Sequence, residues 1–203
     1  LGCERFIGAG SQAEYGRIEG ILRPATPVHP ENSYGIAKLC AGMMSRLRCQ
    51  QLGMEHVWIR VLSIYGPYDG SNTMVMSTIN KLLAGETAET TKGEQLWDYL
   101  FSKDAGKAFY LAGQKGKNGS VYCLGSGQKH PLHEYITKIC EVTAPEAVIH
   151  FGAVPYAENQ VMHLCADITS LQEDTGFEPE TSFEDGIRQT VNWYKKERVG
   201  EKE

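Results

Sequence analysis

The sequence has no basic excess, no long apolar run and no paired cysteine motif, and each absence excludes a class of protein. Its 203 residues carry 20 lysines and arginines against 25 aspartates and glutamates, a net charge of −5, so no positive field attracts nucleic acid or an anionic membrane. No apolar stretch has the length of a membrane span, and the first residues lack the apolar core of a signal peptide. We therefore expect a cytoplasmic protein with a small-molecule partner and with neither a nucleic-acid nor a membrane partner.

The cysteines and histidines do not form a recognisable metal or disulfide pattern. Six cysteines are scattered without a Cys-x-x-Cys pair, which favours reduced buried thiols over a disulfide framework or a zinc site. His130, His133 and Glu134 lie close in sequence but lack a further ligand at a recognisable spacing, so we predict no metal site. The composition, 41% hydrophobic and 22% charged, is that of an ordinary globular protein with a sizeable core.

A glycine-rich segment follows a short apolar stretch near the start of the chain. Residues 8–13, Gly-Ala-Gly-Ser-Gln-Ala, formally satisfy the dinucleotide-binding pattern G-x-G-x-x-A. That pattern requires an amphipathic helix directly after the glycines, whereas Gly16 and the prolines of residues 24–30 break any helix here. We therefore interpret the segment as a strand whose carboxyl end places Ser11 in a loop that contacts a ligand.

Tyr34 and Lys38 stand four residues apart at the start of a predicted helix, which runs from about Ser33 to Gln51 and ends before Gly53. At this spacing the two side chains share one helix face. A phenol is a poor base near neutral pH because its unperturbed pKa is about 10, but a fixed ammonium group beside it favours the phenolate. The pair is a candidate for proton transfer, although Tyr-x-x-x-Lys alone is common by chance and more often marks two solvated helix residues. The apolar residues that mark the helix are Ala37, Ala41, Met44, Leu47 and Leu52, and Met43 and Met44 are expected to fill a core or an interface.

The rest of the chain alternates between predicted strands and helices. Residues 56–65 are nearly continuously apolar and β-branched until Gly66 and Pro67, as expected of a strand buried on both faces. Strand, helix and strand in succession predict a parallel βαβ unit. The further predicted elements are helix 73–84, strand 96–101, helix 103–113, strand 120–124, helix 132–142, strand 147–151 and helix 183–196, the last capped by Ser182.

Taken in order, these segments resemble the extended short-chain dehydrogenase/reductase family, the NAD(P)-dependent epimerases and dehydratases of nucleotide sugars. The matching segments are residues 6–16, 33–38, 59–67 and 97–108, followed by a closing set at 165–171, 175–179 and 183–187. Each motif is weak alone, but their order is specific and covers essentially the whole chain.

The resemblance implies an α/β fold, with a partial Rossmann-like parallel sheet flanked by helices and a small α/β substrate-binding region. It assigns residues 1–66 to the C-terminal part of a cofactor domain with the catalytic residues. It assigns residues 67–203 to a mixed substrate-binding region that retains Rossmann elements at about 96–125.

The resemblance also implies the catalytic roles. Tyr34 is the expected general base or acid, Lys38 is expected to hold the nicotinamide ribose and lower the pKa of the tyrosine, and Ser11 is expected to hydrogen-bond the reacting oxygen. Chemistry agrees, because hydride leaving a carbinol for the nicotinamide requires a nearby base for the hydroxyl proton. The implied cofactor is NAD or NADP, and the implied partner is a nucleotide-sugar substrate.

Two motifs depart from the family pattern at residues with implied binding roles. The backbone around Leu62 is expected near the nicotinamide, and Ser63 and Trp97 near the nucleotide sugar. The family often has asparagine at the position of Ser63 and a phosphate-contacting arginine at that of Trp97. Because a bidentate guanidinium is lost at residue 97, we expect the nucleotide diphosphate to be held differently or the substrate to be unusual.

A third departure concerns the reaction. Family members that remove water from the sugar typically carry an acid pair at the positions of Gln12 and Ala13, neither of which can transfer a proton. We therefore expect a ketoreductase or a 4-epimerase rather than a 4,6-dehydratase.

The glycine fingerprint of the family and the residue that selects NAD or NADP are expected upstream of Leu1. We therefore interpret the chain as the C-terminal portion of a longer enzyme, lacking on the order of 100 residues and binding no cofactor by itself. An exposed sheet edge and the uncovered Tyr34 helix predict self-association as a homodimer. The alternative is a non-catalytic remnant that binds a sugar nucleotide or a partner subunit.

Overall fold

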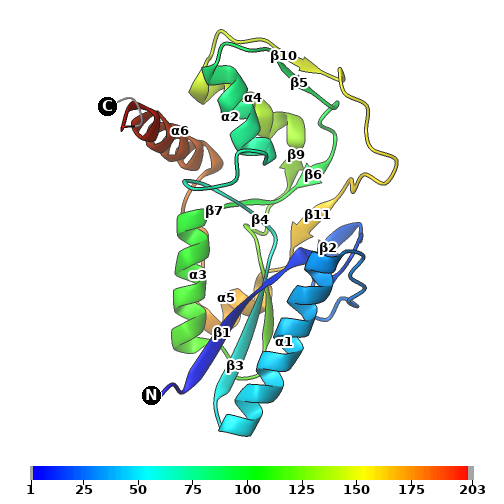
Figure 1. Cartoon of the computed structure of the whole chain (residues 1–203), viewed down its shortest axis with the longest axis vertical. Helices are drawn as coiled ribbons and strands as arrows, with labels where there is room; N and C mark the ends of the chain where they lie inside the picture. Colours follow the sequence, from blue (N-terminus) through cyan, green and yellow to red (C-terminus); the bar gives the residue numbers. More distant parts are fainter. Residues whose placement is uncertain (1, 201–203) are drawn as a thin grey trace.

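Three parallel strands form the sheet that carries the candidate site. The computed structural model describes residues 2–200, without the side chains of 198–200. The strands lie in the order β1 (Arg5–Ser11), β3 (Glu55–Val61) and β8 (Val121–Leu124). Helix α1 (Ser33–Leu52) covers one face, and α3 (Ser102–Lys115) and α5 (Thr169–Thr175) cover the other (Figure 1). The predicted α/β class is therefore confirmed, with parallel strands flanked by helices.

Strand β3 is buried on both faces, as predicted, but its two faces differ in chemistry. Val57 and Ile59 are fully buried in a hydrophobic cluster with α3 and α5. The alternate residues His56, Trp58 and Arg60 are also buried, on the face covered by α1. A polar and aromatic row therefore lies beneath α1, where an apolar one was expected.

The glycines of β1 make room for the Trp58 indole. A Cβ atom at Gly8 would lie 2.1 Å from Cζ3 of Trp58, and one at Gly10 would lie 2.4 Å from its Nε1. Gly42 of α1 closes over the same ring, since a Cβ there would lie 2.8 Å from Cε2. The chain after β1 forms a 3₁₀ turn, η1 (Gln12–Glu14), and no long helix. The G-x-G spacing is thus a packing requirement of this sheet.

Helix α1 has the predicted bounds, within one residue at its end. The Asn32 side chain accepts a hydrogen bond from Gly35 N (2.8 Å), and Gly53 ends the helix in the left-handed conformation at φ 67°. Its packed residues are Gly35, Gly42 and Cys49, spaced by seven.

The large apolar residues of α1 point away from the sheet, contrary to a core role. Met43, Met44, Leu47 and Leu52 are all exposed, Met44 by 71%. The reason is steric, because only small residues allow the helix to approach Trp58 and the sheet backbone this closely. These residues belong to no core among residues 2–200.

Two predicted strands are each divided in the structure. The predicted strand 56–65 ends at Val61, and the chain resumes as β4 (Ser63–Tyr65), which pairs with β7 (Tyr99–Phe101). The predicted strand 96–101 is likewise divided into β6 (Leu96–Trp97) and β7. Asp98 lies at this break, and its buried carboxylate accepts hydrogen bonds from the backbone N–H groups of Ser126, Gly127 and Ala166. These hydrogen bonds hold the chain in a bend at Asp98, so the strand is interrupted there.

A second group of elements lies beyond the carboxyl end of the sheet (Figure 1). Its buried cluster includes Tyr65, Met76, Ile79, Ile139 and Ile187. The predicted helices are confirmed to within a few residues, and Ser182 Oγ accepts a hydrogen bond from Asp185 N (3.1 Å), as expected of a cap. The helices are α2 (Met74–Leu83), α4 (Leu132–Thr143) and α6 (Phe183–Gly200).

Short strand pairs complete the fold, and most of them were not predicted. The strand expected at 147–151 is β10 (Ile149–Phe151). The unpredicted elements are β2 (Gly20–Leu22), which pairs with β11 (Leu164–Ala166), β5 (Ala88–Thr90), which pairs with β10, β9 (His130–Pro131), which pairs with β6, and helix α5. Among residues 2–200, no helix has the length and apolarity for crossing a membrane, and no cluster of three metal-ligating side chains occurs.

Candidate functional site

The predicted catalytic residues lie where β1 and β3 end. Ser11 is the last residue of β1 and pairs in register with Val61, the last residue of β3. Tyr34 and Lys38 lie in the first turns of α1, which begins close to the turn after Ser11. Ligands of open α/β sheets bind at this carboxyl edge of the strands.

Gly35 allows α1 to approach the Ser11 turn. A Cβ atom at Gly35 would lie 2.3 Å from the carbonyl oxygen of Ala13, so a larger residue would push the helix away. Lys38 Nζ donates a hydrogen bond to Ala9 O (2.9 Å) and lies 5.7 Å from the ring centroid of Tyr34. The ammonium group is therefore anchored to β1 beside the phenol, consistent with the predicted pair. Tyr34 is 56% exposed, and its hydroxyl makes no hydrogen bond within the described part of the chain.

Ser11 is buried and belongs to a capping box around η1. Its Oγ accepts a hydrogen bond from Ala13 N (3.2 Å), while its N–H donates to Glu14 Oε1 (2.9 Å). The hydroxyl of Ser11 therefore keeps its own proton to donate to a ligand oxygen. No hydrogen bond joins Ser11 to Tyr34 in residues 2–200.

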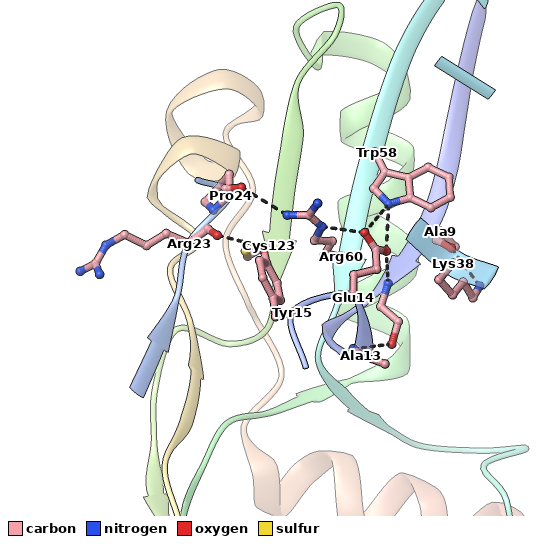
Figure 2. A network of polar contacts seen from close by, with 11 residues as sticks. Ala9, Ala13, Glu14, Tyr15, Arg23, Pro24, Lys38, Trp58, Arg60 and Cys123 are labelled. Atoms are coloured by element: carbon pink, nitrogen blue, oxygen red, sulfur yellow. Dashed lines mark hydrogen bonds and ion pairs between the residues drawn. The ribbon is translucent and has the colours of Figure 1, made fainter. Parts of the chain in front are cut away.

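Glu14 links the Ser11 turn to strand β3, a contact that sequence reasoning missed (Figure 2). The fully buried carboxylate accepts hydrogen bonds from Trp58 Nε1 (3.0 Å) and from Arg60 Nε (2.8 Å). Arg60 also donates to Pro24 O (3.2 Å), and its guanidinium lies 4.6 Å from the Tyr15 ring centroid. The signal in the sequence was an arginine inside the otherwise apolar segment 57–62.

Tyr15 and Cys123 are buried groups of the same network but are poor candidates for chemistry. The Tyr15 hydroxyl donates to Arg23 O (2.9 Å) and lies 3.1 Å from Cys123 Sγ. Burial raises the pKa of Cys123 to about 11 and raises the pKa of Tyr15 further above its ordinary value. Both groups therefore stay protonated near neutral pH, and Cys123 is no nucleophile.

The structure brings Ser63 and Trp97 together. The Trp97 indole Nε1 donates a hydrogen bond to Ser63 Oγ (2.7 Å), which joins β6 to β4. Leu62 is buried beside Leu22 and Leu164, so only its backbone is available for a ligand, and Leu62 N already donates to Leu124 O (2.9 Å).

A cavity of about 320 Å³ opens beside this edge of the sheet. Of the six predicted site residues, only Trp97 lines it. Gln12, next to Ser11, and Asn32, two residues before Tyr34, line it as well. Its wall consists of Gln12, Ala13, Gly16, Arg17, Ile18, Leu22, Glu31, Asn32, Trp97, Val161 and Leu164. Arg17 and Glu31 are further candidates for ligand contact that sequence reasoning missed.

Residues 1–125 match the model of the NAD dependent epimerase/dehydratase family. The chain belongs to this family. Curated relatives include the dTDP-glucose 4,6-dehydratases of Xanthomonas campestris pv. campestris, 27% identical over 94% of this chain, and of Streptomyces niveus, 28% identical over 96%. The chain covers 57% and 58% of those proteins, a little over half of their length.

Solved structures of epimerases superpose on nearly the whole chain. The UDP-glucose 4-epimerase of Thermotoga maritima, determined with UDP-glucose, has a TM-score of 0.84 and 25% identity, over 97% of this chain and 65% of its own. The UDP-glucuronic acid 4-epimerase of Bacillus cereus, determined with NAD, has a TM-score of 0.83 and 19% identity, over 95% and 61%, so it is similar in fold. The epimerase/dehydratase assignment predicted from the motif order is therefore confirmed at the level of the family.

Proposed function

We propose that the protein is an NAD(P)-dependent nucleotide-sugar ketoreductase or 4-epimerase that uses Tyr34, Lys38 and Ser11. The observation that carries the proposal is the Lys38 ammonium, which lies beside the Tyr34 ring and is anchored to Ala9 of β1, the strand that ends at Ser11. Tyr34 transfers the proton of the reacting hydroxyl, and Ser11 donates a hydrogen bond to the same oxygen. Lys38 places a positive charge beside the Tyr34 ring.

The residues at this edge suit the nicotinamide end of the cofactor. Lys38 and the backbone around Leu62 would hold it, and the bound cofactor supplies hydride exchange at the sugar carbon. Gly8 and Gly10 do not serve as a pyrophosphate cradle, because the Trp58 indole occupies the space above them. Among residues 2–200, the cofactor contacts that we propose are therefore those to the nicotinamide ribose.

The reaction class follows from what the turn after Ser11 lacks. The curated relatives named above are 4,6-dehydratases, and elimination of water requires an acid and a base at the sugar. Gln12 and Ala13, which line the cavity, are unable to exchange protons near neutral pH. Tyr34 is the proton-exchanging group of the predicted catalytic residues, and a single such group suffices for oxidation or reduction of a carbinol, which supports a reductase or epimerase.

The test is the Tyr34→Phe variant of the complete protein. Turnover of nucleotide sugars with NAD(P) should fall by orders of magnitude, because the acid-base group is lost, while the cofactor affinity stays nearly unchanged. Tyr110→Phe, at an exposed tyrosine of α3, is the matched control and should retain full turnover.

Mass spectrometry of the products separates the reaction classes. Epimerisation leaves the mass unchanged, reduction adds two hydrogens and dehydration removes water. Unchanged turnover in Tyr34→Phe would overturn the role assigned to Tyr34. A wild type that binds sugar nucleotides or a partner subunit without any turnover would favour the alternative of a non-catalytic protein.

A further inference from the structure

Arg17 and Glu31 are the charged side chains in the wall of the 320 Å³ cavity. Arg17 Nε donates to Glu31 Oε2 at 2.5 Å, and the side chains are 52% and 45% exposed. Within the described part of the chain, the two Nη groups of Arg17 make no hydrogen bond. The guanidinium therefore keeps most of its donors for a ligand.

The backbone holds Arg17 at a fixed place in the cavity wall. Gly16 has φ +75°, and a Cβ atom there would lie 2.2 Å from the carbonyl oxygen of His29. The segment that carries Arg17 is thereby packed against the segment that leads into Glu31 and Asn32. Trp97 belongs to the same wall, so Arg17 and the indole face one ligand space.

Arg23, the next arginine in the sequence, does not line this cavity. Arg23 pairs with Asp167 (3.2 Å) and lines a different cavity, of about 470 Å³, together with Ile21. Leu22, the next residue of β2, lines the 320 Å³ cavity. Because successive residues of a strand face opposite sides, β2 separates the two cavities. Among the described residues, only Arg17 brings a cationic side chain to the cavity beside the catalytic edge.

An exposed ion pair such as Arg17 with Glu31 contributes little, because both groups are well solvated. An anionic ligand group with two oxygens engages a guanidinium in a bidentate manner and forms stronger, charge-assisted hydrogen bonds. A ligand of this kind therefore displaces the Glu31 carboxylate at small cost.

We propose that Arg17 binds an anionic group of the substrate, either a phosphoryl group or a sugar carboxylate, and that Glu31 is the counter-ion it exchanges for that group. The inference rests on the proposed function for the identity of the substrate as a nucleotide sugar. Arg17 is a binding residue here and takes no part in proton transfer.

The test measures the affinities of UDP, UDP-glucose and UDP-glucuronic acid for the complete protein by titration calorimetry. Arg17→Gln should weaken binding of the ligand that carries the recognised group by about tenfold or more, the scale of a charge-assisted hydrogen bond. A similar loss for all three ligands identifies the phosphoryl groups. A loss for UDP-glucuronic acid alone identifies the sugar carboxylate.

Glu31→Gln gives the opposite expectation and excludes a general loss of structure. Removing the competing carboxylate should strengthen binding of the same ligands by about two- to fivefold. Arg188→Gln removes a comparable exposed ion pair, the one with Glu184. Neither residue lines the cavity, so this variant should change no affinity. Unchanged melting temperatures in all three variants show that the fold is kept.

Two results would overturn the inference, and they differ in what else they affect. If the wild type binds the ligands and Arg17→Gln binds them equally well, the inference is wrong, while the Tyr34→Phe test of the proposed function is untouched. If the wild type binds none of the three, the inference fails, whereas the proposed function is still tested by turnover of other nucleotide sugars in the wild type and Tyr34→Phe.

Discussion

Glu14 is the residue on which the Ser11 turn depends, because its carboxylate accepts from Ser11, Trp58 and Arg60 while fully buried. A buried charge is stable only with its partners in place. The sequence of the turn alone does not reveal this, since Arg60 lies on another strand.

Glu14→Gln should therefore destabilise the fold strongly. Loss of the charge leaves Arg60 buried without its counter-ion, which costs about 3–5 kcal/mol of unfolding free energy. Urea unfolding measures the change. Glu31→Gln, which removes an exposed carboxylate from its pair with Arg17, is the matched control and should stay within about 1 kcal/mol. Equal effects of the two substitutions would contradict the role assigned to Glu14.

A substitution at Gly42 tests how tightly Trp58 packs against α1. In an exposed helix, alanine is more favourable than glycine by about 1 kcal/mol, so Gly106→Ala in α3, where a Cβ meets nothing within 4 Å, should stabilise the protein. Gly42→Ala places a Cβ 2.8 Å from the indole and should instead destabilise it by about 1–3 kcal/mol. Thermal unfolding of the two variants gives the sign of each change. Stabilisation by Gly42→Ala would show that the indole moves aside without cost.

At the scale of elements, the contact between α1 and β3 makes stability depend on pH through His56. The ring is buried, hydrogen-bonded through Nε2 to Ser45 Oγ (3.0 Å) and stacked between Phe6 and Trp58. Burial, and then the charge of Arg46, lower the pKa of His56 from its ordinary value.

The sign of the effect follows from proton uptake. Well above about pH 6.5 the imidazole is neutral in both states and contributes nothing to the pH dependence. Below that pH the unfolded chain binds a proton more readily than the folded one, so stability falls as pH falls. Urea midpoints from pH 8 to pH 5 should decline less in His56→Gln than in the wild type. Parallel curves would show that His56 titrates alike in both states.

The elements differ in how far the sequence predicts them. Helices such as α1 and α6 carry their signals locally, in the caps Asn32 and Ser182 and in periodic apolar residues. The short strands β2 and β11 pair across more than 140 residues, and neither has enough length for a periodic pattern. The breaks at Leu62 and Asp98 depend on partners elsewhere in the chain, which no local pattern encodes.

At the scale of the whole molecule, we predict a homodimer from two surfaces. They are the exposed apolar residues of α1 and the edge of β1, which pairs with no second strand among residues 2–200. Met44 and Leu47 are both more than half exposed, and burial of each would contribute about 1.5–3 kcal/mol. Replacing either by glutamine should weaken dimerisation by about tenfold, measured by sedimentation equilibrium. Tyr110→Gln on α3 should leave association unchanged, and a wild type that is monomeric at all concentrations would contradict the prediction.

The sequence by itself determined the family, the α/β class, the longer helices and the spacing that puts Tyr34 and Lys38 on one helix, because motif order and helical periodicity can be read directly along the chain. Only the tertiary structure decided which face of α1 is packed, why β1 needs its glycines, and that Glu14 pairs with Arg60 and Ser63 with Trp97. It also placed Arg17 in the cavity wall beside Trp97. These contacts join residues that are distant in sequence, and steric fit and burial in the folded protein select them.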